Sequence, residues 1–288
     1  MKKVWHEIIN VCIDYKNSFF TKRNFVLLVL LFFVTHIFFR PVKEFAMEVG
    51  YKVSVGSFVF LLFDLYYLLI FIFACIYFFS NVPFLNYHQM YRIVRLGKLK
   101  WGIYQISNIF ISSILLLFVV FCMAAIICFP CNLWENDWGK IIYTLSLTNV
   151  GEEYGVVLHF SYQILKNYTP LQMAGLVFLV GTLCISFLGN MMFLLSLYFS
   201  RVVALSFASI EAALIIMSEN MYLFPKLIFL TPFSWLRFNQ IQYLLENNMP
   251  VPKISEILIY LGIGNLICIV LTLRKLKNVG YSRHIKKE

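Results

Sequence analysis

The feature that most constrains this chain is the alternation of long apolar stretches with short polar segments. Of its 288 residues, 61% are hydrophobic and 13% are charged, whereas a soluble globular domain is roughly 25% charged. The apolar stretches approach the roughly 20 residues that a helix needs to cross a bilayer. The sequence therefore predicts an all-α, polytopic membrane protein with six transmembrane helices.

The apolar stretches define a six-helix transmembrane domain over residues 24–280. We expect its spans at residues 24–39, 57–79, 106–129, 173–198, 202–217 and 257–273, with the first ending at Arg40-Pro41. The polar segments between them are a basic loop (80–107), an outer segment (130–170) and an outer hairpin (219–254) that is too polar to span. A basic tail covers 274–288.

Residues 1–23 precede the first span and are too polar to cross the membrane. Their apolar residues recur at three- and four-residue spacing, which places them on one face of a helix; they are Trp5, Ile8, Ile9, Cys12 and Phe19. We therefore expect an amphipathic leader helix that lies along the cytoplasmic membrane surface.

The formal charge of +10 would fit a nucleic-acid-binding protein, but the basic residues cluster at the ends of spans, so we exclude that class. With six spans, 16 of the 24 Lys and Arg residues fall on the side of both termini and 8 on the other. Cytoplasmic loops are enriched in Lys and Arg. Both termini are therefore expected in the cytoplasm, and the chain in the cell membrane in contact with lipid.

Enzyme and metal motifs are absent from the sequence. The five histidines are dispersed, and there is no HExxH, GxSxG or GxxxxGK[ST] pattern, so we expect no catalytic residue, metal or cofactor in this chain. Cys128 and Cys131 form a CxxC pair, for which chance or a structural disulfide is favoured over a redox or zinc site. The energy for any transport must then come from a gradient or from another polypeptide.

Three polar residues inside the expected spans are candidates for a functional role: Asp64, Asn190 and Glu211. An acid at bilayer depth costs about 2.5–3.5 kcal/mol on insertion scales, so it often marks an ion or substrate path. The alternative is a structural role, in which each acid faces the bundle and is bonded there or lies near a span end. The structural alternative is favoured for both acids, and Asn190 is expected to join two helices.

At this point the layout resembles the type-2 permeases of ATP-binding-cassette (ABC) transporters, the membrane subunits of bacterial exporters. Four features carry the resemblance: the leader helix, the basic loop NYHQMYRIVRLGKLKWGIYQI, the tight turn at Ser200-Arg201, and the outer hairpin containing LTPFSWLRFNQI. The outer segment of about forty residues is longer than such permeases require.

The resemblance implies that the basic loop forms a coupling helix that docks on a separate ATP-binding subunit. The residues expected at this contact are Tyr91, Arg92, Ile93, Arg95, Lys98 and Arg201. The alternative is that these bases obey the positive-inside rule or bind anionic lipid.

The expected function is therefore the permease subunit of an ATP-driven exporter for an amphipathic peptide, antibiotic or lipid-like substrate. It would pair with itself or a similar permease, and the partner ATP-binding subunit would bind ATP and Mg²⁺. The rivals are a gradient-driven transporter or channel that uses Asp64 or Glu211, and a membrane scaffold or sensor without transport.

Overall fold

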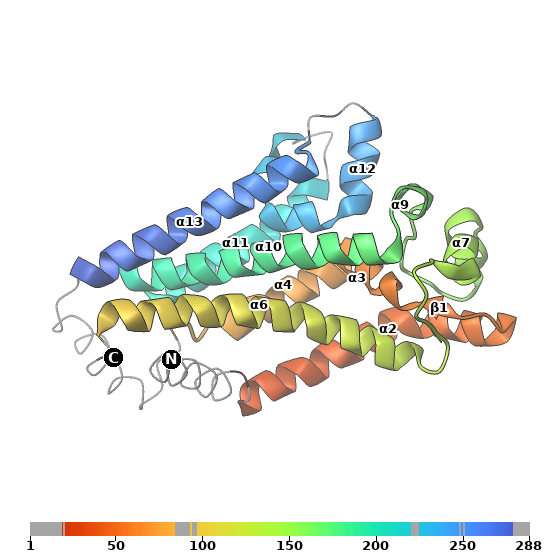
Figure 1. Cartoon of the computed structure of the whole chain (residues 1–288), viewed down its shortest axis with the longest axis horizontal. Coiled ribbons are helices and arrows are strands. Elements are labelled where there is room, and N and C mark those ends of the chain that lie inside the picture. Colours follow the sequence, from red (N-terminus) through yellow and green to blue (C-terminus); the bar gives the residue numbers. More distant parts are fainter. Residues whose placement is uncertain are drawn as a thin grey trace, which may run out of the picture.

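The computed structural model of this chain describes residues 19, 21–83, 93, 97–219, 225–247, 249 and 251–278. It is a bundle of long helices with smaller elements gathered at one end (Figure 1). The long helices are α2 (Lys22–Val49), α4 (Leu65–Phe79), α6 (Lys98–Cys128), α10 (Pro170–Tyr198), α11 (Arg201–Glu219) and α13 (Ile254–Asn278).

The described residues contain five single helices that are long and apolar enough to cross a membrane, namely α2, α6, α10, α11 and α13. A sixth candidate is a bent pair, Val55–Phe63 followed by Leu65–Phe79, with an angle of 87° between its halves. A polytopic, helical membrane protein is thus what the structure describes. The expected leader over residues 1–23 lies almost entirely outside the described residues.

The second expected span, 57–79, is not one continuous helix. It consists of a short 3-10 turn η1 (Val55–Phe58), α3 (Val59–Phe63) and α4, with a break at Asp64. Asp64 has an extended ψ of 133°, and its carboxylate accepts a hydrogen bond of 2.9 Å from the backbone N–H of Tyr67. An aspartate that caps a new helix in this way competes with continuation of the preceding one.

The first span does not end at Arg40-Pro41, as the sequence suggested, because α2 continues through Pro41 to Val49 and ends at Gly50. Beyond the proline the helix buries Phe45 and Ala46. The Phe45 ring packs on Tyr154 with 5.0 Å between ring centroids. Burial of these apolar side chains offsets the cost of a proline inside the helix.

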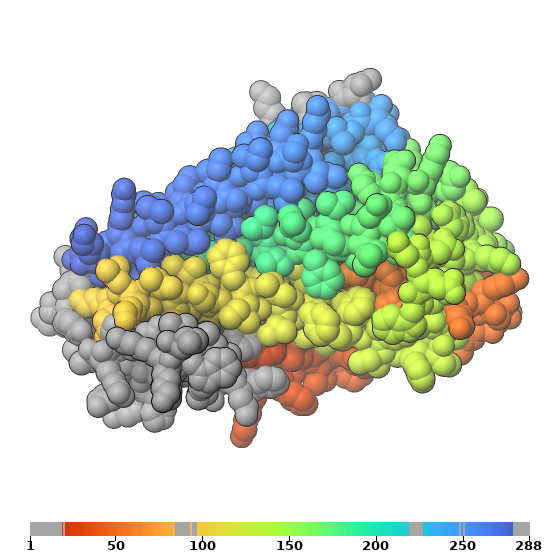
Figure 2. Space-filling model, in the orientation of Figure 1, coloured from red at the N-terminus to blue at the C-terminus, as the bar shows by residue number. Residues whose placement is uncertain are grey.

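The remaining long helices extend past their expected limits, since α6 begins eight residues before 106 and α13 ends five residues after 273. Three contacting helices form the centre of the bundle: α10 packs against both α6 and α13, and α6 also contacts α13. On the face in Figure 2, α13 (blue), α10 (green) and α6 (yellow) lie side by side. The interior of this bundle is mainly apolar and aromatic, and it also contains buried polar side chains such as Asn108, Asn190 and Asn265.

Two glycines allow α6 and α10 to approach closely. A Cβ atom at Gly189 would lie 2.6 Å from Ile109 Cγ2, and one at Gly181 would lie 2.9 Å from Leu117 Cδ1. Both contacts pair residues whose numbers add to 298, so the two helices are antiparallel in a defined register. Small residues at such contacts are typical of helix pairs in membranes.

The outer segment 130–170 and the described residues of the outer hairpin 219–254 form the cap at one end of the bundle (Figure 1). The cap contains α7 (Gly139–Leu147), α8 (Val150–Glu153), α9 (Tyr162–Asn167), η2 (Pro225–Phe229), η3 (Pro232–Leu236) and α12 (Phe238–Glu246). A two-residue strand of the cap, β2 (Asn132–Leu133), pairs in parallel with β1 (Val53–Ser54), which follows α2, and the sequence did not indicate either strand.

Hydrogen bonds within the cap hold it together, and a further one ties it to α11 of the bundle. Trp138 Nε1 donates to Tyr168 O at 2.8 Å, and Trp235 Nε1 donates to Ile228 O at 2.7 Å. The hydroxyl of Ser234 lies 3.0 Å from that of Ser218, near the end of α11. Cys128 and Cys131, for which a disulfide was one expectation, are free thiols in this structure.

Candidate functional site

A cleft at the capped end of the bundle is built around the break at Asp64. Because α3 ends there, the carbonyl of Phe63 is not used by a continuing helix. Arg237, which precedes α12, donates from Nε to this carbonyl at 3.2 Å. Its Nη1 also donates to Gln240 Oε1 at 2.9 Å.

Arg237 is only 8% exposed, so its charge is largely removed from solvent. A cation is stabilised at the C-terminal end of a helix, where backbone carbonyls carry partial negative charge. The contact with Phe63 therefore gives the guanidinium a backbone partner and gives the broken span a fixed end. It also joins the second span to the outer hairpin.

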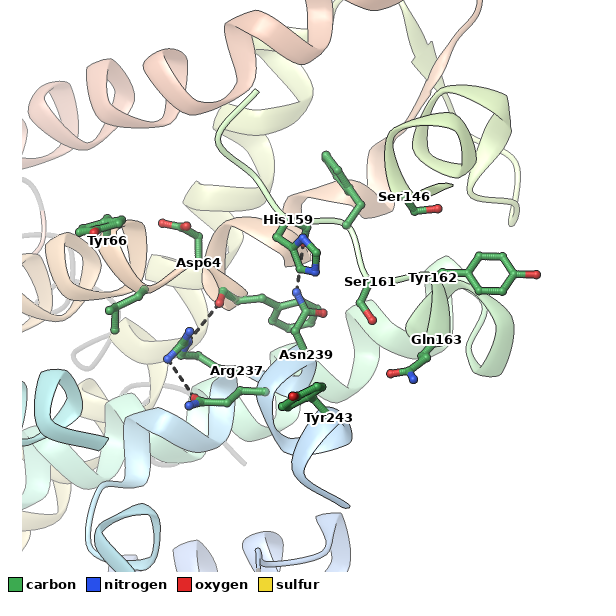
Figure 3. A pocket seen from close by; sticks show the side chains of 14 residues that line it. Asp64, Tyr66, Ser146, His159, Ser161, Tyr162, Gln163, Arg237, Asn239 and Tyr243 are labelled. Atoms are coloured by element: carbon green, nitrogen blue, oxygen red, sulfur yellow. Dashed lines mark hydrogen bonds between the residues drawn. The ribbon is translucent and has the colours of Figure 1, made fainter. Parts of the chain in front are cut away.

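The cleft has a volume of about 770 Å³, within the range of roughly 300–1,000 Å³ for ligand pockets. Figure 3 shows Asp64 and Tyr66 on one side of the group, His159 and Ser161 on the chain segment before α9, and Tyr243 on α12. Its lining consists of Phe63, Asp64, Leu65, Tyr66, Ser146, His159, Phe160, Ser161, Tyr162, Gln163, Arg237, Asn239, Gln240 and Tyr243.

Two further bonds hold the walls of the cleft together. Asn239 Nδ2 donates to the carbonyl of His159 at 3.1 Å, and Gln163 Nε2 donates to Glu246 at the end of α12. Phe63 and Phe160 add aromatic rings to the lining, and Phe160 packs on the buried Phe60 with 4.8 Å between ring centroids. The cleft is thus a preformed surface between three segments distant in sequence.

A second polar group lies inside the bundle, between α10 and α13. Asn190 Nδ2 donates to Asn265 Oδ1 at 2.9 Å, and Ser186 Oγ donates to the same oxygen at 3.3 Å. Asn265 Nδ2 donates to the main-chain oxygens of Leu183 and Leu261. The structure thus places Asn190 in a contact between two helices, and Asn190 does not line the cleft.

The register of α6 against α10 places further polar residues at the same depth. Asn108 lies at the level of Asn190, and Ser112 at the level of Ser186, since both pairs add to 298. Both α6 residues are at most 2% exposed. A buried polar layer therefore crosses α6, α10 and α13, and the sequence analysis had recognised only its Asn190.

The end of the bundle opposite the cap is strongly basic. Eight Lys and Arg residues lie in the described helix ends there, and those ends contain no Asp or Glu; the eight are Lys22, Arg23, Lys98, Lys100, Arg201, Arg274, Lys275 and Lys277. Acidic and basic residues are mixed at the capped end. We call the first set the basic end.

The expected docking residues are only partly described. Lys98 is the first residue of α6 and Arg201 the first of α11, and both lie at the basic end. Ile93 is helical and half-buried, and its carbonyl accepts a hydrogen bond of 3.0 Å from Gly97 N. Tyr91, Arg92 and Arg95 lie outside the described residues.

The two acids of the expected spans are not brought together. Asp64 lines the cleft, whereas Glu211 lies half-buried in α11 and does not line it. Asp64 caps a helix at a break and is not inside a continuous span. Arg237, His159 and Tyr243 were not singled out from sequence, because only the fold brings their segments together.

Within the part of the chain that the structure describes, no three His, Cys, Asp or Glu side chains are grouped closely enough to hold a metal ion. Comparisons with protein-family models, with curated proteins and with solved structures gave no match.

Proposed function

We propose that this chain is the transmembrane permease subunit of an ATP-driven exporter. The observation that carries the proposal is the basic end, where the start of α6, the start of α11 and the last turn of α13 lie on one side of the molecule. The positive-inside rule puts this side in the cytoplasm. A soluble ATP-binding subunit with acidic side chains could dock there.

The start of α6 is well placed to pass movement from such a partner into the bundle. Trp101, in its first turn, packs on Phe193 near the end of α10, with ring centroids 5.9 Å apart. A Cβ at Gly102 would lie 2.3 Å from Leu276 Cδ1 of α13. A tilt imposed at Lys98 would therefore displace α10 and α13 directly, because close-packed helices move as units.

In this proposal the permease pairs with itself or a similar chain, and the partner subunits bind ATP and Mg²⁺ and hydrolyse the nucleotide. The cargo is amphipathic. It is a peptide, an antibiotic or a lipid-like molecule, and we favour a peptide. Membrane lipid surrounds the helices, whose exposed faces are apolar; on α2 these include Phe25, Leu30, Phe33 and Ile37.

One observation favours a second candidate, a gradient-driven transporter or channel. Broken helices in transporters often coordinate ions with backbone carbonyls at the break, and this chain has such a break at Asp64. Here, however, Arg237 occupies the Phe63 carbonyl. A guanidinium at that position disfavours a metal cation, so we place the ATP-driven exporter first.

The test is purification of the tagged chain from native membranes in mild detergent, with mass spectrometry and an ATPase assay on the product. We expect a stoichiometric ATP-binding subunit and ATPase activity. The double variant Arg92→Glu/Arg95→Glu should lose both, because reversing two charges would repel an acidic partner.

The matched control is Lys166→Glu/Lys253→Glu, which makes the same change of charge at exposed positions of the capped end. It should keep the partner and the ATPase activity. A wild-type chain that purifies alone and without ATPase activity would refute the proposal. Transport that follows an ion gradient, and fails in Asp64→Asn, would then support the second candidate.

A further inference from the structure

We propose that the cleft at the capped end binds an extended peptide segment on the outer side of the membrane. This inference deepens the proposed function and rests on it, because the bound peptide is a transported cargo only if the chain is an exporter subunit. It is argued from the chemistry of the cleft lining, which has three components: exposed tyrosines, neutral hydrogen-bonding side chains, and two fixed charges.

The tyrosines supply the contact area. Tyr66, Tyr162 and Tyr243 are 67%, 45% and 58% exposed, and they come from α4, α9 and α12. An exposed tyrosine offers an apolar ring and a polar hydroxyl at a low cost in side-chain entropy, which is why tyrosine is enriched in surfaces that recognise proteins and peptides.

The neutral polar side chains match the needs of a peptide backbone. Gln163, Asn239 and Gln240 carry amides, and Ser146 and Ser161 carry hydroxyls. Each of these groups can donate and accept, and a peptide main chain presents a donor and an acceptor at nearly every residue. Tyrosine with serine and asparagine-type side chains is also the combination that antibody binding sites use.

A lipid chain is a poorer occupant of the same cleft. An acyl chain would cover the amides and hydroxyls without offering a hydrogen bond, and each polar group buried in this way costs free energy. The lining also contains Asp64, His159 and Arg237, polar groups with which an alkyl chain could form no hydrogen bond.

The charges do not favour a strongly anionic ligand. Arg237 already donates to Phe63 O and to Gln240, and the cleft also contains the carboxylate of Asp64. Opposite charges within one lining favour a ligand that is neutral overall. An uncharged or weakly charged peptide satisfies this condition, whereas a nucleotide does not.

The experiment uses the full chain, immobilised in lipid nanodiscs without any partner subunit. The probe is a pool of hexapeptides with blocked ends, randomised over uncharged residues, and a lysophospholipid is offered in parallel. Retained peptide and lipid are measured by mass spectrometry. The test variant is Tyr66→Ala/Tyr243→Ala, which removes two exposed rings from opposite sides of the cleft.

The control is Trp134→Ala, which removes a 72% exposed ring at the capped end that does not line the cleft. Wild type and control should retain peptide, and the tyrosine variant should retain at least about fivefold less, the loss typical of truncated aromatic anchors. Thermal unfolding of all three proteins should coincide, which separates lost binding from lost folding.

Three results would overturn the inference: no peptide retained by wild type, equal retention by the tyrosine variant, or cleft-dependent retention of lysophospholipid in place of peptide. The outcome is independent of the partner test above, since this assay contains no ATP-binding subunit. If peptide is retained here but no ATP-binding subunit co-purifies in the partner test, the cleft assignment stands and the exporter proposal is refuted. If the subunit co-purifies but no peptide is retained, the exporter proposal stands and the cleft assignment is refuted.

Discussion

Arg237 Nε donates a hydrogen bond of 3.2 Å to the main-chain oxygen of Phe63, across 174 positions of the sequence. This bond connects the end of a broken span to the segment that begins α12. It lies beside the cleft and holds two of its walls at a fixed separation. The stability of the capped end should therefore depend on one buried guanidinium.

We predict that Arg237→Met lowers the stability of the purified protein. The substitution leaves the Phe63 carbonyl and Gln240 Oε1 without this donor, and a lost partner for a buried polar group costs about 1–3 kcal/mol. The midpoint of thermal unfolding in detergent should fall by several degrees. Lys253→Met, at an exposed position, is the control; equal midpoints for the two variants would contradict the prediction.

Two substitutions of glycine by alanine should have different effects on the stability of the protein. Gly189→Ala places a Cβ 2.6 Å from Ile109 Cγ2 and 3.2 Å from the Phe79 ring, and forced overpacking costs roughly 1–3 kcal/mol. Gly262→Ala meets no atom within 4 Å and gains helix propensity. Unfolding in a graded detergent mixture should show a loss of stability for Gly189→Ala only. A similar loss of stability in both variants would show that the close contact at Gly189 is not the cause.

The bond between Asn190 and Asn265 should give a measurable coupling energy. In a double-mutant cycle with Asn190→Ala and Asn265→Ala, we expect about 0.6 kcal/mol and at most about 1.7 kcal/mol, the average and the maximum found for polar contacts between membrane helices. Thr272→Val is the control, because its hydroxyl bonds within its own helix, to Cys268 O at 2.7 Å. A coupling near zero would mean that the two amides act separately.

The orientation of the bundle can be checked with single cysteines in a variant whose seven native cysteines are replaced. A membrane-impermeant maleimide should label Trp134→Cys in intact cells. It should label Arg201→Cys only after permeabilisation, since Arg201 belongs to the basic end. Labelling of both positions from outside would refute the assignment of the basic end to the cytoplasm.

The helical, membrane-type architecture could be predicted from the sequence because its signal is local. A stretch such as 106–129 is apolar over the length of a bilayer, whatever its neighbours are. The same holds for the bases at span ends, such as Lys98 and Arg201. The ends of the helices were less predictable. Pro41 was expected to end a helix, but α2 continues past it, where Phe45 and Ala46 are buried.

The cleft could not be predicted, because it depends on where distant segments meet. Asp64 was identified as unusual, but a lone acid in an apolar stretch does not reveal that the helix breaks there and turns by 87°. Arg237 was one outer base among several, and nothing in its neighbourhood indicates a bond to a carbonyl in another span. His159 and Tyr243 gave no signal of their own.

The sequence by itself thus determined the membrane-type character of this protein, because apolar stretches of bilayer length favour lipid over water, and it determined the uneven distribution of Lys and Arg along the chain. The tertiary structure alone decided the polar geometry, namely the pairing of Asn190 with Asn265 and of Arg237 with Phe63. The physical reason is that hydrophobic burial is non-directional and readable along the chain, whereas a hydrogen bond needs two groups at about 3 Å, which only the folded arrangement specifies.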